Sequence, residues 1–252
     1  MNAPTGRLAG RNILITGASS GIGANFARVC AREGAAVAIG ARRVDRLASL
    51  ATEIEAAGGR AFAVPLDVAD ETSVIAAFDA AQDTFGPIDG VVANAGITFE
   101  GRALDIDIHD FDQLFAVNVR GVFLTTREGA RRMRANGVAD RGRIVLISSI
   151  TAQMRTPGAA AYSASKAAVT HMGKLLACEW ARSGPNVNLL SPGYIASELT
   201  AEWFASEGGR KHVETWPRRR MLDDDALDAA LIYLLSDESR NEDVRETSKL
   251  QM

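Results

Sequence analysis

Short apolar runs that alternate with helical segments constrain the fold of this chain more than any other feature. The run Ala35–Ile39 is typical, because apolar and polar residues do not alternate along it. A strand has this pattern when helices cover both faces of a parallel sheet. Six such strands are predicted, at residues 13–15, 35–39, 61–66, 88–93, 143–147 and 186–190. Helices are predicted at residues 24–33, 45–57, 71–85, 108–134, 161–182 and 224–235.

This alternation predicts an α/β fold: a doubly wound, Rossmann-type parallel sheet of six to seven strands with helices on both faces. A chain of 252 residues can build such a sheet around one core. No repeat or linker divides it, so we expect a single domain over residues 1–252.

Composition restricts the function classes. The formal net charge of -3 provides no excess of basic side chains for binding nucleic-acid phosphates. The sequence has two cysteines, neither in a metal-ligand spacing, and no apolar run long enough for a membrane span. We therefore expect a cytoplasmic protein with a small-molecule partner, and neither a metal site nor nucleic-acid or membrane binding.

A glycine-rich turn joins the first predicted strand to the first predicted helix. It reads Thr16-Gly17-Ala18-Ser19-Ser20-Gly21-Ile22-Gly23. Glycines at this place let the backbone approach a pyrophosphate, whose charge is favoured by free N–H groups and by the positive end of the helix dipole. A tight turn that needs glycine for positive φ remains the alternative.

Tyr162 and Lys166 form a second candidate for chemistry. They lie four residues apart in a predicted helix, a spacing that places both side chains on one face. A free tyrosine has a pKa of about 10 and exchanges protons poorly at neutral pH. A nearby ammonium favours the phenolate and lowers that pKa, so the two residues can form an acid/base pair. For the pair alone, a packed tyrosine beside a solvated lysine remains the alternative.

Further motifs follow the predicted strands in order. They are Asn94-Ala95-Gly96 after the fourth strand, Asn118 in the next helix, Ser149 after the fifth strand and Ser191-Pro192-Gly193 after the sixth. With the glycine-rich turn and the Tyr-x-x-x-Lys pair, the series resembles the short-chain dehydrogenase/reductase family, whose motifs are TGxxxGxG and YxxxK. The resemblance covers roughly residues 8–240. It implies hydride transfer between a nicotinamide cofactor and an alcohol or carbonyl substrate.

The resemblance implies four catalytic residues, Asn118, Ser149, Tyr162 and Lys166. Tyr162 would be the acid/base, and Lys166 would bind the nicotinamide ribose and lower the pKa of the tyrosine. Ser149 would hydrogen-bond the substrate oxygen. It is preferred to Ser148 because it lies thirteen residues before Tyr162, the usual family spacing. Asn118 would hold a water that connects Lys166 to solvent, with a merely buried polar residue as the alternative.

The resemblance also implies a set of cofactor-binding residues at the carboxyl ends of the strands. They are Gly17, Ser19, Ser20, Gly21, Ile22, Gly23, Arg42, Arg43, Asp67, Val68, Asn94, Ala95, Gly96, Tyr162, Lys166, Pro192, Gly193, Ile195 and Ser197. Within this set, Asp67 and Val68 would contact the adenine, and the segment that contains Ile195 and Ser197 would flank the nicotinamide.

The end of the second strand bears on the choice of cofactor. NAD sites place a carboxylate there for the ribose 2′-hydroxyl, whereas a 2′-phosphate requires an arginine. The strand here ends in Arg42 and Arg43, with no acid where NAD-dependent family members carry aspartate. Arg42 therefore resembles a 2′-phosphate clamp, assisted by Arg43, and NADP(H) is favoured over NAD(H). Two solvated loop arginines remain the alternative.

Two segments depart from the regular pattern. Residues 195–217 fall in the region that covers the substrate in this family, and Trp203 and Phe204 make it a candidate lid. Residues 238–252 are polar and charged and contain no convincing seventh strand, unlike the usual family ending. We expect this atypical tail to be disordered or re-routed. The protein would then be a homodimer built on the helices at 107–134 and 161–182, although a tetramer stays possible.

The sequence thus predicts an NADP(H)-dependent oxidoreductase that acts on a ketone or secondary alcohol, similar to 3-oxoacyl or carbonyl reductases. Two alternatives remain: an NAD-dependent alcohol dehydrogenase, and a non-catalytic NADP(H)-binding sensor or scaffold. Substrate, direction and stereochemistry are not encoded in these motifs.

Overall fold

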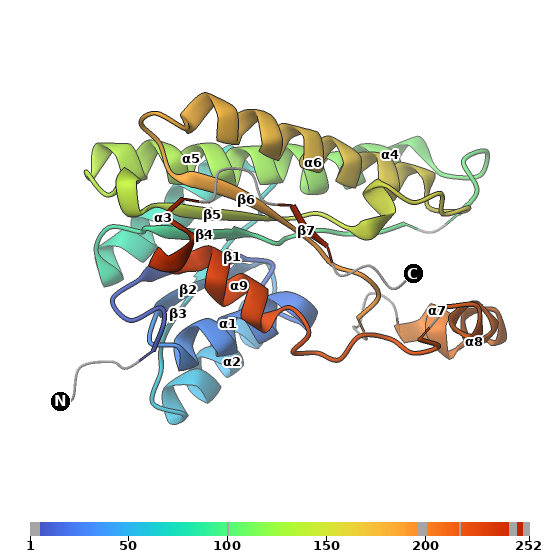
Figure 1. Cartoon of the computed structure of the whole chain (residues 1–252), viewed down its shortest axis with the longest axis horizontal. Coiled ribbons are helices and arrows are strands. Elements are labelled where there is room, and N and C mark those ends of the chain that lie inside the picture. The colour runs from blue at the N-terminus through green and yellow to red at the C-terminus, as the bar shows by residue number, and fades with distance from the viewer. Residues whose placement is uncertain (1–5, 100, 196–200, 217, 242–245, 249–252) are drawn as a thin grey trace.

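A single parallel sheet organises the molecule (Figure 1). The computed structural model describes residues 6–99, 101–195, 201–216, 218–241 and 246–248. Strand order is β3-β2-β1-β4-β5-β6-β7. The strands are β1 Asn12–Thr16, β2 Ala36–Ala41, β3 Arg60–Pro65, β4 Gly90–Ala93, β5 Arg143–Ile147, β6 Asn186–Ser191 and β7 Glu246–Ser248. The predicted fold class is confirmed, with seven strands in the described chain.

Helices cover both faces of the sheet, as Figure 1 shows. On one face lie α1 Gly21–Arg32, α2 Val44–Ala56 and α9 Asp228–Leu235. On the other face lie α3 Glu71–Phe85, α5 Val122–Ala135 and α6 Ala160–Trp180. This arrangement explains the unalternating strand sequences, because each strand needs apolar side chains on both sides.

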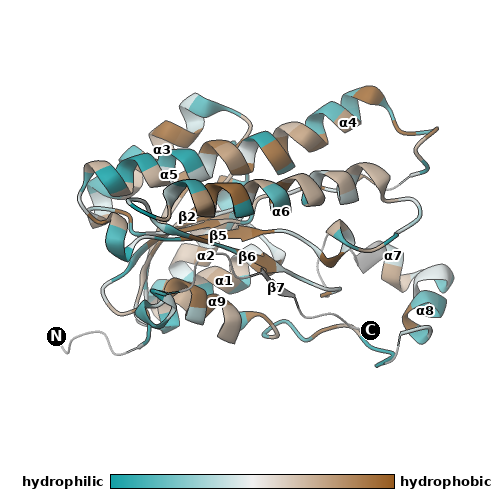
Figure 2. Ribbon diagram, turned by 45° about the horizontal axis from the view of Figure 1, so that its top comes forward, coloured by the Kyte–Doolittle hydropathy of each residue, from teal (hydrophilic) through white to brown (hydrophobic). Residues whose placement is uncertain are grey.

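The central strand β1 divides its side chains between two cores. Ile13 and Ile15 pack with the core under α1 and α2, and Leu14, which points the opposite way, packs with the core under α3 and α5. All three side chains are fully buried. Figure 2 shows hydrophobic residues in the central strands and both hydrophobic and hydrophilic residues along the helices around them. Burial of apolar side chains of this size contributes about 1.5–3 kcal/mol each.

The strand order reverses direction between β1 and β4. From β1 the chain first proceeds outward through β2 and β3, then returns to place β4 on the other side of β1. The loops after β1 and β4 therefore diverge at the carboxyl edge of the sheet and leave a crevice. Doubly wound sheets bind their ligands at such a point.

The segment predicted as one long helix at 108–134 has three parts. An α-helix, α4 Ile108–Phe115, and α5 are joined by a π-helix at Ala116–Gly121. Apolar periodicity does not reveal such a bulge, because the helix pattern resumes on both sides of it. Since π-bulges are frequent at functional sites, the position of Asn118 inside this one makes Asn118 a stronger site candidate.

The candidate lid contains two short helices, α7 Ala201–Ala205 and α8 Glu207–Glu214, which project beyond the carboxyl edge of the sheet (Figure 1). The segment is anchored where Ile195 forms a parallel β-bridge with Leu222. Three 3₁₀ helices complete the described elements, at Ala139–Arg141, Ile150–Ala152 and Asp237–Ser239.

The atypical tail forms a strand after all. Residues Glu246–Ser248 pair in parallel with Leu189–Ser191 of β6, so the expectation that a seventh strand is lacking is wrong. Backbone hydrogen bonds alone can recruit a polar segment to an open sheet edge, which is why the apolar pattern missed it. The expected dimer stays a prediction; Phe123 of α5 and Leu175 of α6 are exposed on the helices proposed to form it.

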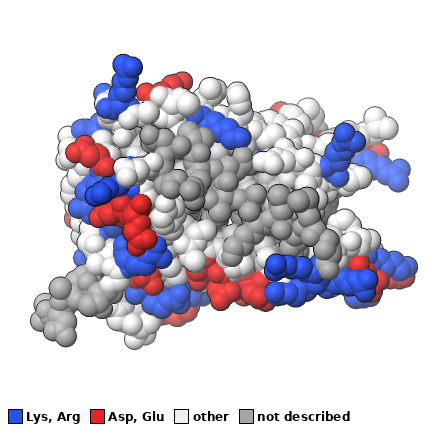
Figure 3. Space-filling model, viewed as in Figure 1, with Lys and Arg blue, Asp and Glu red and all other residues white. Residues whose placement is uncertain are grey.

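The surface carries both signs of charge. On the face in Figure 3, basic and acidic side chains are interspersed over the described residues. Within the described residues, no helix has the length and apolar character needed to cross a membrane.

Thr126 allows a test of the core in α5. Its side chain is fully buried, and its hydroxyl has no hydrogen-bond partner among the described residues. Because an unsatisfied buried hydroxyl is costly, Thr126→Val should stabilise the fold by about 1 kcal/mol. We expect the midpoint of thermal unfolding to rise by about 2–4 °C. An equal or lower midpoint in calorimetry would show that the hydroxyl has a partner.

Candidate active site

The glycine-rich turn leaves the start of α1 open to the crevice. Gly17 and Gly21 have φ values of 68° and 53°, in the left-handed region that favours glycine. The N-cap residue Ser20 makes no side-chain hydrogen bond to the helix. The first N–H groups of α1 are thus not capped by this side chain, and a helix start of this kind binds pyrophosphate.

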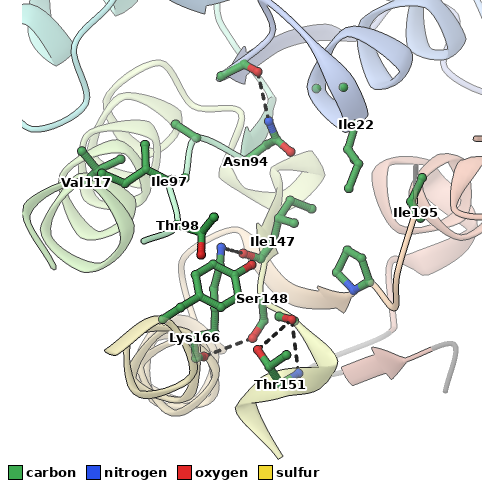
Figure 4. Close-up of a pocket in the computed structure, with 18 of the residues that line it drawn as sticks. Ile22, Asn94, Ile97, Thr98, Val117, Ile147, Ser148, Thr151, Lys166 and Ile195 are labelled. Carbon is green, nitrogen blue, oxygen red and sulfur yellow. Dashed lines mark hydrogen bonds between the residues drawn. The ribbon is translucent and has the colours of Figure 1, made fainter. Parts of the chain in front are cut away.

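Thr16 and Asn94 fasten this turn to β4. The Thr16 hydroxyl oxygen accepts hydrogen bonds from the backbone N–H of Asn94 at 3.1 Å and of Ala95 at 3.0 Å. In return, the Asn94 amide donates to the backbone oxygens of Thr16 at 2.9 Å and Gly17 at 3.3 Å. A Cβ on Gly23 would lie 2.5 Å from the Asn94 nitrogen, so the approach requires glycine. Figure 4 includes Asn94 and Ile22 at this end of the pocket.

The two arginines after β2 occupy different positions. Arg43 donates to the hydroxyls of Ser19 at 2.9 Å and Ser20 at 2.6 Å, which brings its guanidinium onto the glycine-rich turn. Arg42 lines the same cavity. The sequence ranked Arg42 above Arg43 as the phosphate ligand, whereas the contacts give Arg43 at least an equal claim.

Lys166 is a buried cation on α6. Its side chain is 3% exposed, and its Nζ donates to the backbone oxygen of Ile147 at 2.9 Å, the bond drawn in Figure 4. Burial lowers the pKa of the ammonium to about 8. The Nζ lies 5.8 Å from the centre of the Tyr162 ring, so the predicted pair does share one face of the helix.

The pKa of Tyr162 departs from the sequence-based expectation. Burial raises it to about 12, and a hydrogen bond with Ser149 opposes this by lowering it. Lys166 was expected to lower this pKa, but its ammonium bonds Ile147 instead of the phenol. The exposed area of Tyr162 shows only partial burial, so water or ligands in the cavity will weaken the effect of burial. The phenol of Tyr162 therefore carries its proton at neutral pH.

Two adjacent serines after β5 face different partners. Ser148 donates to the backbone oxygen of Lys166 at 3.1 Å and bonds the Thr170 hydroxyl at 2.6 Å. Its hydroxyl is thus engaged with α6. Ser149 instead reaches Tyr162, which supports its selection over Ser148 as the substrate-facing serine.

Asn118 holds the loop after β4 against α6. From its place in the π-helix, its fully buried side chain accepts from the N–H of Ile97 at 2.8 Å and donates to the oxygen of Ile97 at 2.9 Å and to Ser165 at 3.1 Å. A Cβ on Gly96 would lie 3.4 Å from both Asn118 and the Lys166 ammonium. Asn118 is therefore close to Lys166, but its amide is committed to Ile97 and Ser165, so the water-holding role stays a prediction.

One cavity of about 750 Å³ connects these groups. All predicted catalytic residues except Asn118 line it. So do the predicted cofactor residues within the described chain. Ser197 falls outside the described residues. Asp67, at the cofactor end, uses its carboxylate to accept from the N–H of Ala69 at 3.0 Å.

The other end of the cavity has an aromatic wall that the sequence only partly predicts. Trp203 and Phe204 of the lid line it, joined by Tyr194 from the loop after β6. Tyr194 stacks on Trp216 with ring centres 4.8 Å apart. The sequence analysis did not select Tyr194, although its position next to the Pro192-Gly193 motif was an available signal. Other lining residues that were missed include Thr98, Gly101, Arg102, Thr151, Thr156 and Pro157.

Comparison with known proteins agrees with this geometry. A model of the short chain dehydrogenase family matches residues 11–208. Oxidoreductase UcpA of Salmonella typhimurium is 39% identical over 243 residues, which cover 93% of this chain and 90% of the relative. Gluconate 5-dehydrogenase of Gluconobacter oxydans is 38% identical over 200 residues, 79% of this chain and 77% of the relative.

A solved structure extends the comparison to three dimensions. A gluconate 5-dehydrogenase from Burkholderia cenocepacia, in complex with NADP and tartrate, has a TM-score of 0.89 at 33% identity, and covers 96% of this chain and 95% of that one. The chain therefore belongs to the short-chain dehydrogenase/reductase family. It is an enzyme of the oxidoreductase class.

The buried ammonium of Lys166 should reduce stability at neutral pH. Lys166→Met removes the charge and keeps an unbranched side chain, so the variant should be about 1–3 kcal/mol more stable at pH 7. The folded pKa of about 8 lies below the ordinary value of 10.5, so unfolded chains bind more protons between these values. The stability of the wild type therefore rises with pH across this window, and the difference from the variant should shrink.

Chemical denaturation of both proteins between pH 7 and pH 10.5 measures this difference. Tyr162 lies next to the ammonium, but its pKa of about 12 is above this range, and the more distant titrating groups are common to the two proteins and cancel. A variant less stable than the wild type at pH 7, or a gap that widens above pH 8, would contradict the assignment of a costly buried ammonium.

Proposed function

We propose that this enzyme is an NADP(H)-dependent reductase or dehydrogenase that interconverts a ketone and a secondary alcohol. The observation that supports this proposal is one cavity that contains both a pyrophosphate-type helix start and the Ser149–Tyr162–Lys166 group. A cofactor bound along the glycine-rich turn would extend from that helix start toward the hydroxyl of Tyr162.

The residues present fit a dinucleotide. The uncapped start of α1 suits the pyrophosphate, and Asp67 and Val68 lie at the adenine end of the cavity. Pro192, Gly193 and Ile195 line the cavity near the catalytic group, where a nicotinamide would lie. When bound, the nicotinamide would donate hydride to the carbonyl carbon or accept it in the reverse direction.

The chain's own residues perform the proton chemistry. In the reductive direction Tyr162, neutral in this structure, donates the proton to the substrate oxygen, and Ser149 donates a hydrogen bond to that oxygen as negative charge develops on it. In the oxidative direction Tyr162 accepts the proton of the alcohol. Lys166 supplies a positive charge 5.8 Å from the tyrosine ring, which favours the ionised phenol formed after proton donation.

NADP(H) is favoured by the two guanidinium groups at the cofactor end. Arg42 and Arg43 follow β2, where a 2′-phosphate would lie, and Arg43 already reaches the turn that would hold the pyrophosphate. The structural neighbour from Burkholderia cenocepacia, which was solved with NADP, supports the same choice.

The aromatic wall bears on the substrate. Relatives named gluconate 5-dehydrogenase suggest a polyol acid, whereas Tyr194, Trp203 and Phe204 favour a substrate with an apolar or ring face. Both kinds of substrate can carry a ketone or a secondary alcohol, which we propose as the reacting group. The helices α7 and α8 would cover the bound substrate.

Tyr162→Phe tests the catalytic assignment. The variant keeps the ring but lacks the proton, so turnover should fall by at least about 1000-fold while NADPH binding is kept. NADPH oxidation across a panel of sugar-acid, alicyclic, aryl and β-keto ester substrates measures turnover, and fluorescence titration measures binding. Wild-type turnover by the variant would refute the role of Tyr162. A wild type that binds NADPH but reduces no substrate would favour a sensor or scaffold.

Arg42→Asp tests the choice of cofactor. Loss of a charge-assisted contact to the 2′-phosphate should weaken NADPH binding about 10- to 100-fold and leave NADH binding unchanged or improved. Arg43→Ala should weaken NADPH binding to a similar degree. Arg28→Ala, which removes an exposed arginine paired with Glu53, is the matched control. Equal losses of affinity for NADPH and NADH would show that the arginines do not bind the 2′-phosphate.

A further inference from the structure

Thr151 makes two contacts with the substrate-facing serine. Its backbone N–H donates to the Ser149 Oγ at 3.2 Å, and its hydroxyl donates to the same oxygen at 3.0 Å. Both residues are buried, with 8% of Ser149 and 6% of Thr151 exposed, and both line the cavity. Figure 4 shows Thr151 and the two dashed bonds that end on one oxygen.

These bonds occupy the acceptor capacity of Ser149. A hydroxyl oxygen has two acceptor positions and one hydrogen to donate. With both acceptor positions filled by Thr151, the Ser149 hydrogen must point to another acceptor. Ser149 and Tyr162 line the same cavity, and a Ser149 hydroxyl that donates toward Tyr162 agrees with the lowering of the Tyr162 pKa by this serine.

We propose that Thr151 is a positioning residue that fixes Ser149 as a hydrogen-bond donor toward Tyr162 and the substrate oxygen. This inference rests on the proposed reaction, in which negative charge develops on that oxygen. Without the threonine hydroxyl, one acceptor position of Ser149 is open, and Ser149 can accept from Tyr162 instead. The tyrosine proton would then point at the serine and away from the substrate.

The hydrogen bond from Thr151 to Ser149 also strengthens the one that Ser149 donates toward Tyr162. Each hydroxyl that donates becomes a better donor when its oxygen accepts from another, and this polarisation is larger in a low-dielectric site. Ser149 caps the 3₁₀ helix at Ile150–Ala152 by accepting the hydrogen bond from the backbone N–H of Thr151. That bond alone would be enough for the cap. The additional hydroxyl bond therefore acts on the direction of the Ser149 proton.

Two variants separate the hydroxyl from the shape of the side chain. Thr151→Val keeps the shape and the backbone N–H but removes the donor, whereas Thr151→Ser keeps the donor. Thr126→Val, the same exchange in α5 outside the cavity, is the matched control. With a ketone that the wild type reduces, Thr151→Val should lower kcat about 5- to 30-fold, leave the KM for NADPH unchanged and shift the basic limb of the pH profile upward. Thr151→Ser should restore kcat to within about 3-fold.

A second readout does not depend on turnover. The chain has three tyrosines, so Tyr162→Phe identifies the Tyr162 signal in spectra of protein labelled with ¹³C at the tyrosine ζ carbon. That signal should move in Thr151→Val, return in Thr151→Ser and remain unchanged in Thr126→Val. An unmoved signal together with wild-type kcat overturns the positioning role. So does a serine variant as impaired as the valine variant, because the methyl group would then be the cause. Failure of the proposed reaction appears differently, as a wild type without turnover whose Tyr162 signal still responds to Thr151→Val.

Discussion

The hydrogen bonds between Thr16 and Asn94 are the contacts on which the rest of the site depends. They join the ends of β1 and β4, where the sheet reverses its order of strands and the loops diverge. Four backbone groups in these turns find partners there without occupying the crevice between them. The glycine-rich turn can therefore remain close-packed against β4 while the start of α1 faces the cavity.

The proposed catalytic groups are held by elements that lie next to the Thr16–Asn94 hydrogen bonds. Lys166 bonds the last residue of β5, and Asn118 bonds Ile97 in the loop after β4. These bonds attach both α6 and the π-helix to the carboxyl edge of the sheet. The proposed substrate side is built differently, from an aromatic wall of Trp203 and Phe204 in α7 and Tyr194 in the loop after β6. The proposed proton-transfer groups thus lie on the sheet edge and α6, whereas the proposed substrate cover lies on separate short helices.

Most of the fold could be predicted from the sequence, and the candidate site residues that the structure describes, except Asn118, line one cavity. Strands such as β5 have apolar runs that a doubly covered sheet explains, and the spacing between Ser149 and Tyr162 selects Ser149 as the candidate serine, whereas the Ser148 hydroxyl bonds α6. Three features follow from contacts that no local pattern records: the π-helix around Asn118, the bond from Arg43 to the serines of the turn, and the pairing of the polar segment at 246–248 with β6. The pKa of Tyr162 likewise depends on tertiary burial.

The π-helix has a consequence for how this scaffold can change. It accommodates one residue more than an α-helical path would, so the helical faces before and after it are out of phase by about 100°. Deleting one residue of this π-helix before Asn118 would restore an ordinary helix and rotate Asn118 relative to Ile97, and it would also disturb the close packing of Gly121 against Val68. The amide exchange rate of Ile97 in such a deletion would report the lost contact with Asn118.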